Sequence, residues 1–357
     1  TTGYSYQFQN FGKTSNRGIE LSVNVDVINK GDFRFNVGAI YNYNRNKLDE
    51  LPNADQYLYS SYWGSSSLVP TNDYMFVEGK AIGLVRGFIS EGYYTVDDFN
   101  YTNGQYVLKE GVPDITKALT ATYMHPYDLP AGQTAFPGAA KFRDVDESGT
   151  VDLDDATCLG EVMPRHTGSF QLNFNYKNFD LSTNFNWTAG GKVYNVAAMI
   201  NASGQEFDGI GAQRASWVAD AFKVYNVNAA GDLYAVTNPD ELRALNANAK
   251  YHLPYHQSGI TSSEWLENGS YLRLLTLGYT LPKNWLTKVH VDKIRLYLTA
   301  TNLFTITGYS GIDPEVNANP TGQSGFYSDL RIFPTLNMDF GTYPRARTFT
   351  FGANITF

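Results

Sequence analysis

Apolar and polar residues alternate along several stretches of this chain, and two of these stretches lie near its start. Every second residue of 19–27 falls on one apolar face, which comprises Ile19, Leu21, Val23, Val25 and Val27. After a short turn at 30–32, residues 33–47 repeat the pattern with a partly aromatic face, which comprises Phe33, Phe35, Val37, Ala39, Tyr41 and Tyr43. A period of two predicts β-strands, so the two stretches are expected to form a hairpin. Each strand would run for about 12–14 residues, longer than most strands of soluble sheets.

The same alternation returns in the second half of the chain. A second hairpin is expected from 168–177 and 179–188, with its turn at 178–179, and a third pair from 271–282 and 293–304. The sequence ends on an alternating strand whose apolar positions are Phe349, Phe351, Ala353, Ile355 and Phe357. Such lengths suit strands that cross a bilayer, which need about 9–11 residues for the apolar band.

The connections between these strands also alternate in length. Tight turns follow some strands, whereas long segments follow others, at about 48–80, 95–135, 191–268 and 305–344. Short turns on one side and long loops on the other are typical of outer-membrane β-barrels, whose long loops face the outside of the cell. Short helices are expected within two of the long segments, one in 206–225 and one in 238–248, capped at Asn238 or Asp240.

These patterns predict an all-β fold: a membrane-spanning antiparallel β-barrel. In a closed barrel no strand edge is left open, which explains how a chain can finish on an apolar strand. The alternative is a large soluble β-sandwich, whose strands also alternate. Strand length, asparagine-rich inner faces and tyrosines near strand ends favour the barrel.

Composition narrows the range of functions. Charged residues make up 17% of the 357 residues and aromatic residues 15%, which suits a β-protein with two differently wetted faces. The net charge of −8 argues against a nucleic-acid partner. No run of eighteen apolar residues is present, so no transmembrane helix is expected.

The single cysteine, Cys158, has no obvious base beside it and there is no Gly-x-Ser-x-Gly motif, so we predict that the protein is not an enzyme.

One motif points to a specific ligand. Residues 144–155 match the twelve-position calcium loop, with Gly149 at the sharp turn. The candidate Ca²⁺ ligands are Asp144, Asp146, Ser148, Thr150, Asp152 and Asp155. Thr150 would contribute its backbone carbonyl, and the other five would contribute side-chain oxygens. Asp152 holds the ninth position, often a water-mediated ligand, and Asp155 holds the twelfth, where helix–loop–helix calcium proteins usually have glutamate. The expected role is to stiffen a loop, and the alternative is an acidic turn without metal.

Several segments resemble one family, the SusC/RagA-type TonB-dependent outer-membrane transporters. The resemblance is carried, in the family's order, by 16–23 (NRGIELSV), 83–95, 137–155, 176–195 (YKNFDLSTNFNWTAGGKVYN), 267–282 (ENGSYLRLLTLGYTLP), 301–317 and 343–357. The family's plug domain, TonB box and first half of the barrel have no counterpart here, and Glu-Ser-Gly at 147–149 replaces the commoner Gly-Asp-Gly. The chain therefore resembles the C-terminal portion, about ten strands, of a larger plugged barrel of about 22 strands.

The resemblance implies a function. Such proteins import large nutrients, usually oligosaccharides and sometimes oligopeptides, across the outer membrane of Bacteroidota. The implied partners are outer-membrane lipid, a SusD-like lipoprotein that forms a lid, TonB acting through a plug domain, and the N-terminal half of the barrel. The sequence does not single out substrate-binding residues. The alternative function is a structural or adhesive outer-membrane β-barrel without TonB-coupled transport.

Overall fold

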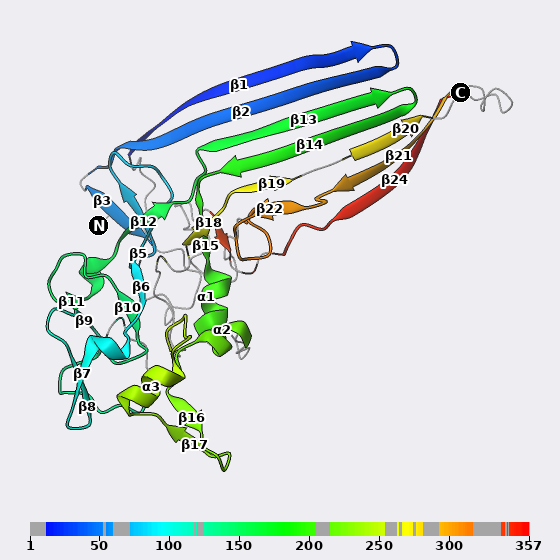
Figure 1. The fold of residues 1–357 in the computed structure, drawn as a ribbon. Coiled ribbons are helices and arrows are strands. Elements are labelled where there is room, and N and C mark those ends of the chain that lie inside the picture. The colour runs from blue at the N-terminus through cyan, green and yellow to red at the C-terminus, as the bar shows by residue number, and fades with distance from the viewer. Residues whose placement is uncertain are drawn as a thin grey trace, which may run out of the picture.

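The computed structural model describes residues 12–52, 55–59, 72–117, 119, 125–203, 215–253, 263, 266–273, 276–280, 293–316, 337–339, 341 and 343–356. It has two parts, a sheet of long strands and a more compact region at one end of that sheet (Figure 1). We call the compact part the loop region, because it is built from segments that connect the long strands.

The long strands form a nine-stranded antiparallel sheet in the order β1-β2-β13-β14-β20-β21-β24, with β19 and β22 beside this path. Their bounds are β1 Lys13–Lys30, β2 Phe33–Glu50, β13 His166–Tyr176, β14 Phe179–Ala189, β19 Tyr271–Arg273, β20 Thr276–Thr280, β21 Lys293–Thr301, β22 Thr305–Thr307 and β24 Thr348–Thr356. The strands on this path follow each other in chain order: three pairs are consecutive strands, and segments that carry the shorter strands separate the other neighbours. Within the described residues, β1 and β24 form the two edges of the sheet.

The expected hairpins are present, and the first two each have a residue with a left-handed backbone in the turn. Gly31, with a φ of 58°, lies between β1 and β2, and Lys177, with a φ of 51°, lies between β13 and β14. β1 and β2 are each 18 residues long, longer than their apolar stretches predict. The extra residues extend the hairpin past its apolar face at the end that meets the loop region. Phe357, which the sequence places on the apolar face of the last strand, lies outside the described residues.

The loop region consists of short strands. Their bounds are β3 Gln56–Tyr59, β4 Tyr74–Val77, β5 Leu84–Gly87, β6 Ser90–Tyr93, β7 Phe99–Thr102, β8 Gln105–Leu108, β9 Asp114–Ile115, β10 Ala140–Phe142, β11 Thr150–Val151, β12 Thr157–Glu161, β15 Lys192–Asn195, β16 Tyr225–Val227, β17 Leu233–Ala235, β18 Leu266–Asn268 and β23 Met338–Asp339. The largest group among them is the sheet β12-β5-β4-β3. Segments expected as long connections therefore carry regular structure of their own.

Short helices complete the loop region: α1 Val196–Ser203, α2 Ala215–Asp220, α3 Pro239–Leu245, and the 3₁₀ turns η1 Val96–Asp98 and η2 Leu153–Asp155. The two helices expected from sequence correspond to α2 and α3. The side chain of Asn238 caps α3, because its oxygen accepts hydrogen bonds from the backbone N–H groups of Asp240 and Glu241 at 2.9 and 3.2 Å.

The buried cores lie in the loop region and at its junction with the sheet. One core is rich in aromatic side chains, and its members include Phe88, Tyr94, Tyr106, Phe136, Phe142, Phe222 and Leu242. A second core joins the loop region to the start of the sheet, and its members include Leu48, Tyr59, Tyr74, Val162, Tyr194 and Met338. By contrast, β1 is exposed along almost its whole length. Among the described residues, these cores include only Leu48 from the long strands, at the end of β2 that meets the loop region.

Candidate functional site

The outer face of the sheet is apolar and uncovered. Ile19, Leu21 and Phe351 keep 60%, 57% and 74% of their surface exposed, although apolar side chains at regular strand positions are normally buried. A continuous exposed apolar face of this kind marks contact with another apolar phase. For strands of this length, that phase is the hydrocarbon of a membrane.

Aromatic side chains border this face at both ends. At the loop end, Tyr41 stacks with Trp187 at 6.2 Å between ring centroids, and the Tyr41 hydroxyl is 2.8 Å from Nδ1 of His166. At the turn end, Phe179 packs on Tyr279 at 4.2 Å. Phe33 and Tyr43, which belong to the two borders, are separated by most of β2. At about 3.3 Å per residue and a tilt of about 40°, this separation corresponds to about 25 Å of membrane thickness, as expected for aromatic girdles.

The opposite face of the sheet is polar and carries a ladder of hydrogen bonds across four strands. The amide of Asn36 donates to Oδ1 of Asn24 at 2.7 Å and to Oδ1 of Asp26 at 2.9 Å. The amide of Asn173 donates to Oδ1 of Asn36 at 3.4 Å, and the hydroxyl of Ser182 donates to Oδ1 of Asn173 at 2.6 Å. These residues lie at matching registers, so they cross the sheet at one level. This is the asparagine-rich inner face that the sequence predicts for a barrel lumen.

An ion pair extends the polar face towards the last strands. Arg295 on β21 donates from Nη2 to Oδ2 of Asp180 on β14 at 2.5 Å, and from Nε to Oδ1 at 3.1 Å. Its guanidinium also lies 5.6 Å from the ring centroid of Tyr297. Sequence reasoning missed this pair. Alternation gives the face on which each residue lies, but the pairing of β14 with β20 and of β20 with β21 brings the two together.

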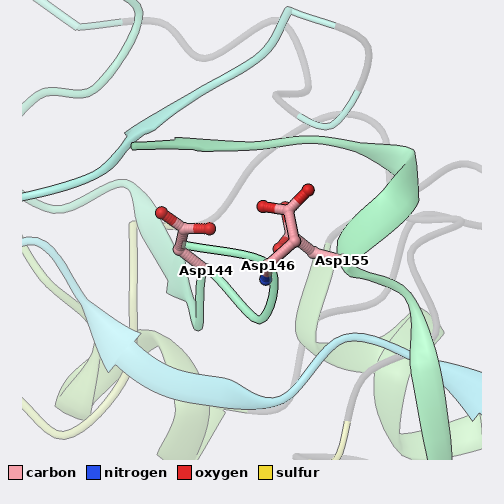
Figure 2. A group of neighbouring side chains, drawn as sticks. All are labelled: Asp144, Asp146 and Asp155. Atoms are coloured by element: carbon pink, nitrogen blue, oxygen red, sulfur yellow. The ribbon is translucent and has the colours of Figure 1, made fainter. Parts of the chain in front are cut away.

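The predicted calcium loop brings three of its candidate ligands together. Figure 2 shows Asp144, Asp146 and Asp155, and one carboxylate oxygen of each lies within 4.8 Å of the others. Asp155 is fully buried, and its Oδ1 accepts the Val145 N–H at 2.6 Å. Its Oδ2 accepts the Asp152 N–H at 2.8 Å. Asp155 therefore ties the two ends of the loop together.

The other three candidate ligands make bonds within the loop. The hydroxyl of Ser148 donates to the backbone carbonyl of Thr150 at 3.0 Å. The carboxylate of Asp152 accepts the Asp154 N–H at 2.8 Å and so caps η2. Glu147, with a φ of 59°, and Gly149, with a φ of 86°, make the sharp turn that places Ser148 at the tip.

Backbone donors compensate part of the negative charge of the loop. Oδ2 of Asp144 accepts the Gly149 N–H at 2.7 Å, and Oδ1 of Asp146 accepts the Ser148 N–H at 3.0 Å. Hydrogen bonding by Ser148, chiefly through its side chain, holds the pKa of Asp146 below its ordinary value. The three carboxylates thus lie close together, and oxygen ligands of this type are what Ca²⁺ prefers.

The loop is attached to the rest of the loop region on both sides. β11 pairs in parallel with β9, and the Asp114 N–H donates to the Gly149 carbonyl at 3.2 Å. Arg86 of β5 donates to the carbonyl of Leu153 at 3.1 Å. Val151 is fully buried in the aromatic core. The conformation of the acidic loop is therefore coupled to the packing around it.

Comparison with known proteins finds relatives of the whole chain. No family model matches the chain. The TonB-dependent receptor P3 of Formosa agariphila is 29% identical over the whole chain, and the TonB-dependent receptor SusC of Bacteroides thetaiotaomicron is 24% identical over 98% of it. Over nearly its whole length, the chain is thus similar to TonB-dependent receptors, one of which is named SusC. It spans 30% of the length of receptor P3 and 27% of that of SusC.

Solved SusC/RagA-type structures share the fold. The RagAB peptide transporter matches 99% of the chain with a TM-score of 0.60 at 20% identity, and the RagAB peptide importer in its closed-closed state matches with a TM-score of 0.61 at 19% identity. In each case the chain covers 31% of the solved chain. The predicted fold class, a portion of a larger outer-membrane β-barrel, is confirmed.

The names of the relatives bear on whether the protein is an enzyme. The relatives are named receptors and importers, which agrees with the prediction that the protein is not an enzyme. Among the helices of the described residues, none has the length and apolar character needed to span a membrane.

Proposed function

We propose that this chain is the part of a TonB-dependent importer that supplies outer-membrane strands and extracellular loops for nutrient uptake. The observation that carries the proposal is the match over the whole chain to TonB-dependent receptors, together with the sheet whose apolar and polar faces are separated. The polar face would line the lumen, and the loop region would surround the entrance.

The proposed cargo is a large nutrient, with an oligosaccharide as the first candidate and an oligopeptide as the second. The likeness to a receptor named SusC and to a peptide importer supports testing both. The proposed partners are a SusD-like surface lipoprotein that covers the entrance and TonB, which would act through a plug domain. Outer-membrane lipid surrounds the apolar face.

Uptake in living cells tests this proposal. Cells that carry the full-length gene should accumulate a labelled oligosaccharide or oligopeptide, and cells that lack the gene should not. A protonophore should abolish accumulation, because TonB transmits energy from the inner membrane. Accumulation that survives the protonophore would contradict TonB coupling. Normal adhesion with no gene-dependent uptake of either nutrient class would favour the alternative, a structural or adhesive barrel.

We also propose that residues 144–155 hold a structural Ca²⁺. The convergence of Asp144, Asp146 and Asp155 supports this, since three carboxylates within 4.8 Å repel each other without a cation. Ser148, Thr150 and Asp152 remain candidate ligands, and the first two would exchange their mutual hydrogen bond for the ion. Bound Ca²⁺ would hold the loop against β9 and the aromatic core.

Limited proteolysis tests the calcium proposal. Chelation should speed tryptic cleavage after Arg143, which directly precedes the loop, and added Ca²⁺ should restore protection. Asp146→Asn should weaken this protection because it removes one charged ligand. Asp154→Asn is the matched control, because Asp154 is an exposed carboxylate of the same loop outside the three-residue cluster. A cleavage rate that does not change on chelation would contradict the proposed Ca²⁺ site.

A further inference from the structure

Two arginines lie opposite each other on the outer face of the first hairpin. The register of β1 and β2 pairs Arg17 directly with Arg45, and the pairing is unbroken from this point to the apolar pair Val25 and Val37. Both arginines therefore belong to the same face as the lipid-facing side chains. Both are exposed.

The position of the pair along the strands is specific. Moving from the turn towards the loop end, the outer face passes from aliphatic pairs to Leu21 with Tyr41, then Ile19 with Tyr43, and then Arg17 with Arg45. The arginines lie two residues beyond the last aromatic pair, which is about 7 Å along the strand. This is where a bilayer changes from the aromatic border to charged headgroups.

The two positive charges have no acidic partner in the part of the chain that the structure describes. No hydrogen bond or ion pair joins Arg17 or Arg45 to a carboxylate there, whereas Lys47, the next outward residue of β2, lies 3.4 Å from Asp49. Like charges directly opposite each other destabilise a pair of strands. An anion placed between them would reverse this effect, and paired guanidinium groups match the geometry of phosphate oxygens.

We propose that Arg17 and Arg45 form a binding site for a phosphate-bearing lipid headgroup of the outer leaflet. The site faces the outer leaflet because it lies at the loop end of the sheet, and long loops of outer-membrane barrels face outwards. The acyl chains of the same lipid would lie along Ile19, Leu21 and Val23, which are exposed directly below the arginines. The phosphate would neutralise the facing charges and fix the lipid against the hairpin.

Binding of a defined lipid to the full-length receptor tests this site. The detergent-purified receptor, stripped of lipid, is titrated with diphosphoryl lipid A and followed by native mass spectrometry. Arg17→Gln combined with Arg45→Gln should weaken binding roughly tenfold, because two charged contacts to phosphate are lost. The matched control is Arg34→Gln on β2, because the register pairs Arg34 with Asn29 and Asn175 near the opposite end of the sheet. It should leave the affinity unchanged.

A second probe separates headgroup recognition from general lipid contact. Fully dephosphorylated lipid A should bind the wild-type receptor about as weakly as diphosphoryl lipid A binds the double variant. Equal binding of the two lipids by the wild type would overturn the proposal. So would a double variant that loses thermal stability but keeps its lipid affinity, because the arginines would then be satisfied by carboxylates of another strand.

The test remains decisive if the double variant does not assemble. Arg17→Lys combined with Arg45→Lys keeps both charges and should retain most of the affinity. Raising the salt concentration from 50 to 500 mM should weaken binding of diphosphoryl lipid A to the wild type, since screening acts on exposed charges. Binding that is independent of salt would contradict a phosphate site.

Discussion

At the scale of single residues, position on one face or the other of the sheet decides what a side chain contributes. Leu172 lies on the apolar face near the middle of the membrane span, where it pairs with Val37 and Thr183. Asn184 directly follows Thr183 in β14, so it lies on the polar face at nearly the same depth as Leu172. The two positions therefore provide a pair at similar depth on opposite faces of the sheet.

An arginine placed at each position should destabilise the protein to very different extents. Leu172→Arg should cost about 2–4 kcal/mol, because it moves a charge into hydrocarbon near the midplane, whereas Asn184→Arg should cost much less. Urea unfolding of the receptor in lipid vesicles measures both. Equal costs would mean that the two faces are assigned wrongly.

A buried histidine in the loop region makes stability depend on pH. His252 is 3% exposed and its Nδ1 is 2.9 Å from the Leu253 carbonyl oxygen. Burial lowers the pKa of His252 to about 4, below the value of about 6.5 in an unfolded chain. The unfolded state therefore takes up a proton first as the pH falls.

The expected consequence is a loss of stability between about pH 6.5 and pH 4. At pH 5 the loop region should be less stable than at pH 7 by about 2 kcal/mol. Hydrogen exchange of amides near α2 and the 251–253 segment, compared at the two pH values after correction for intrinsic rates, measures this. The variant His252→Gln should remove most of the difference, and a variant with the full pH dependence would assign it to another group.

At the scale of elements, local sequence signals work where one element depends on its own residues. The hairpins β1–β2 and β13–β14 follow from period-two alternation and short turns, and α3 follows from an asparagine placed directly before a proline. The acidic loop was predicted from spacing with six ligands, and the structure gathers three of them. The other three make short-range hydrogen bonds whose geometry the spacing does not specify.

The cap of α3 gives a prediction at this scale. Asn238→Ala should destabilise α3 by about 1 kcal/mol, because two backbone donors lose their acceptor. Asn238→Asp should retain the cap, since its carboxylate accepts the same bonds and favours the helix N-terminus. Exchange rates of the α3 amides distinguish the variants. If the Asn238→Ala and Asn238→Asp variants show the same exchange rates, packing of the buried Leu242 stabilises the helix without a contribution from the cap.

At the scale of the whole molecule, the packing of the loop region could not be predicted from the sequence. Its contacts join segments far apart in the chain. The hydroxyl of Tyr106 donates to the Thr237 carbonyl at 2.8 Å, and Lys141 pairs with Asp98 at 2.8 Å. Such pairings carry no local periodicity, so the sequence indicated long connections with two short helices and the acidic loop, but not how these segments pack together. The sheet, in contrast, was predictable because lipid and lumen impose a simple alternation on each strand.

The two parts together define an orientation in the membrane. The short turns of the long hairpins lie at one end of the sheet, and the loop region with its buried cores lies at the other (Figure 1). The apolar face between them is bordered by aromatic side chains at both ends. We therefore expect the loop region to be outside the cell and the short turns to face the periplasm.

Epitope accessibility on intact cells tests this central claim most directly. One tag is inserted after Ala230, in the turn between β16 and β17, and a second after Gly31, in the turn between β1 and β2. Antibody should label the first tag on intact cells and the second only after the outer membrane is permeabilised. Labelling of both tags on intact cells, or of neither without permeabilisation, would contradict a sheet that spans the outer membrane with its loop region outside.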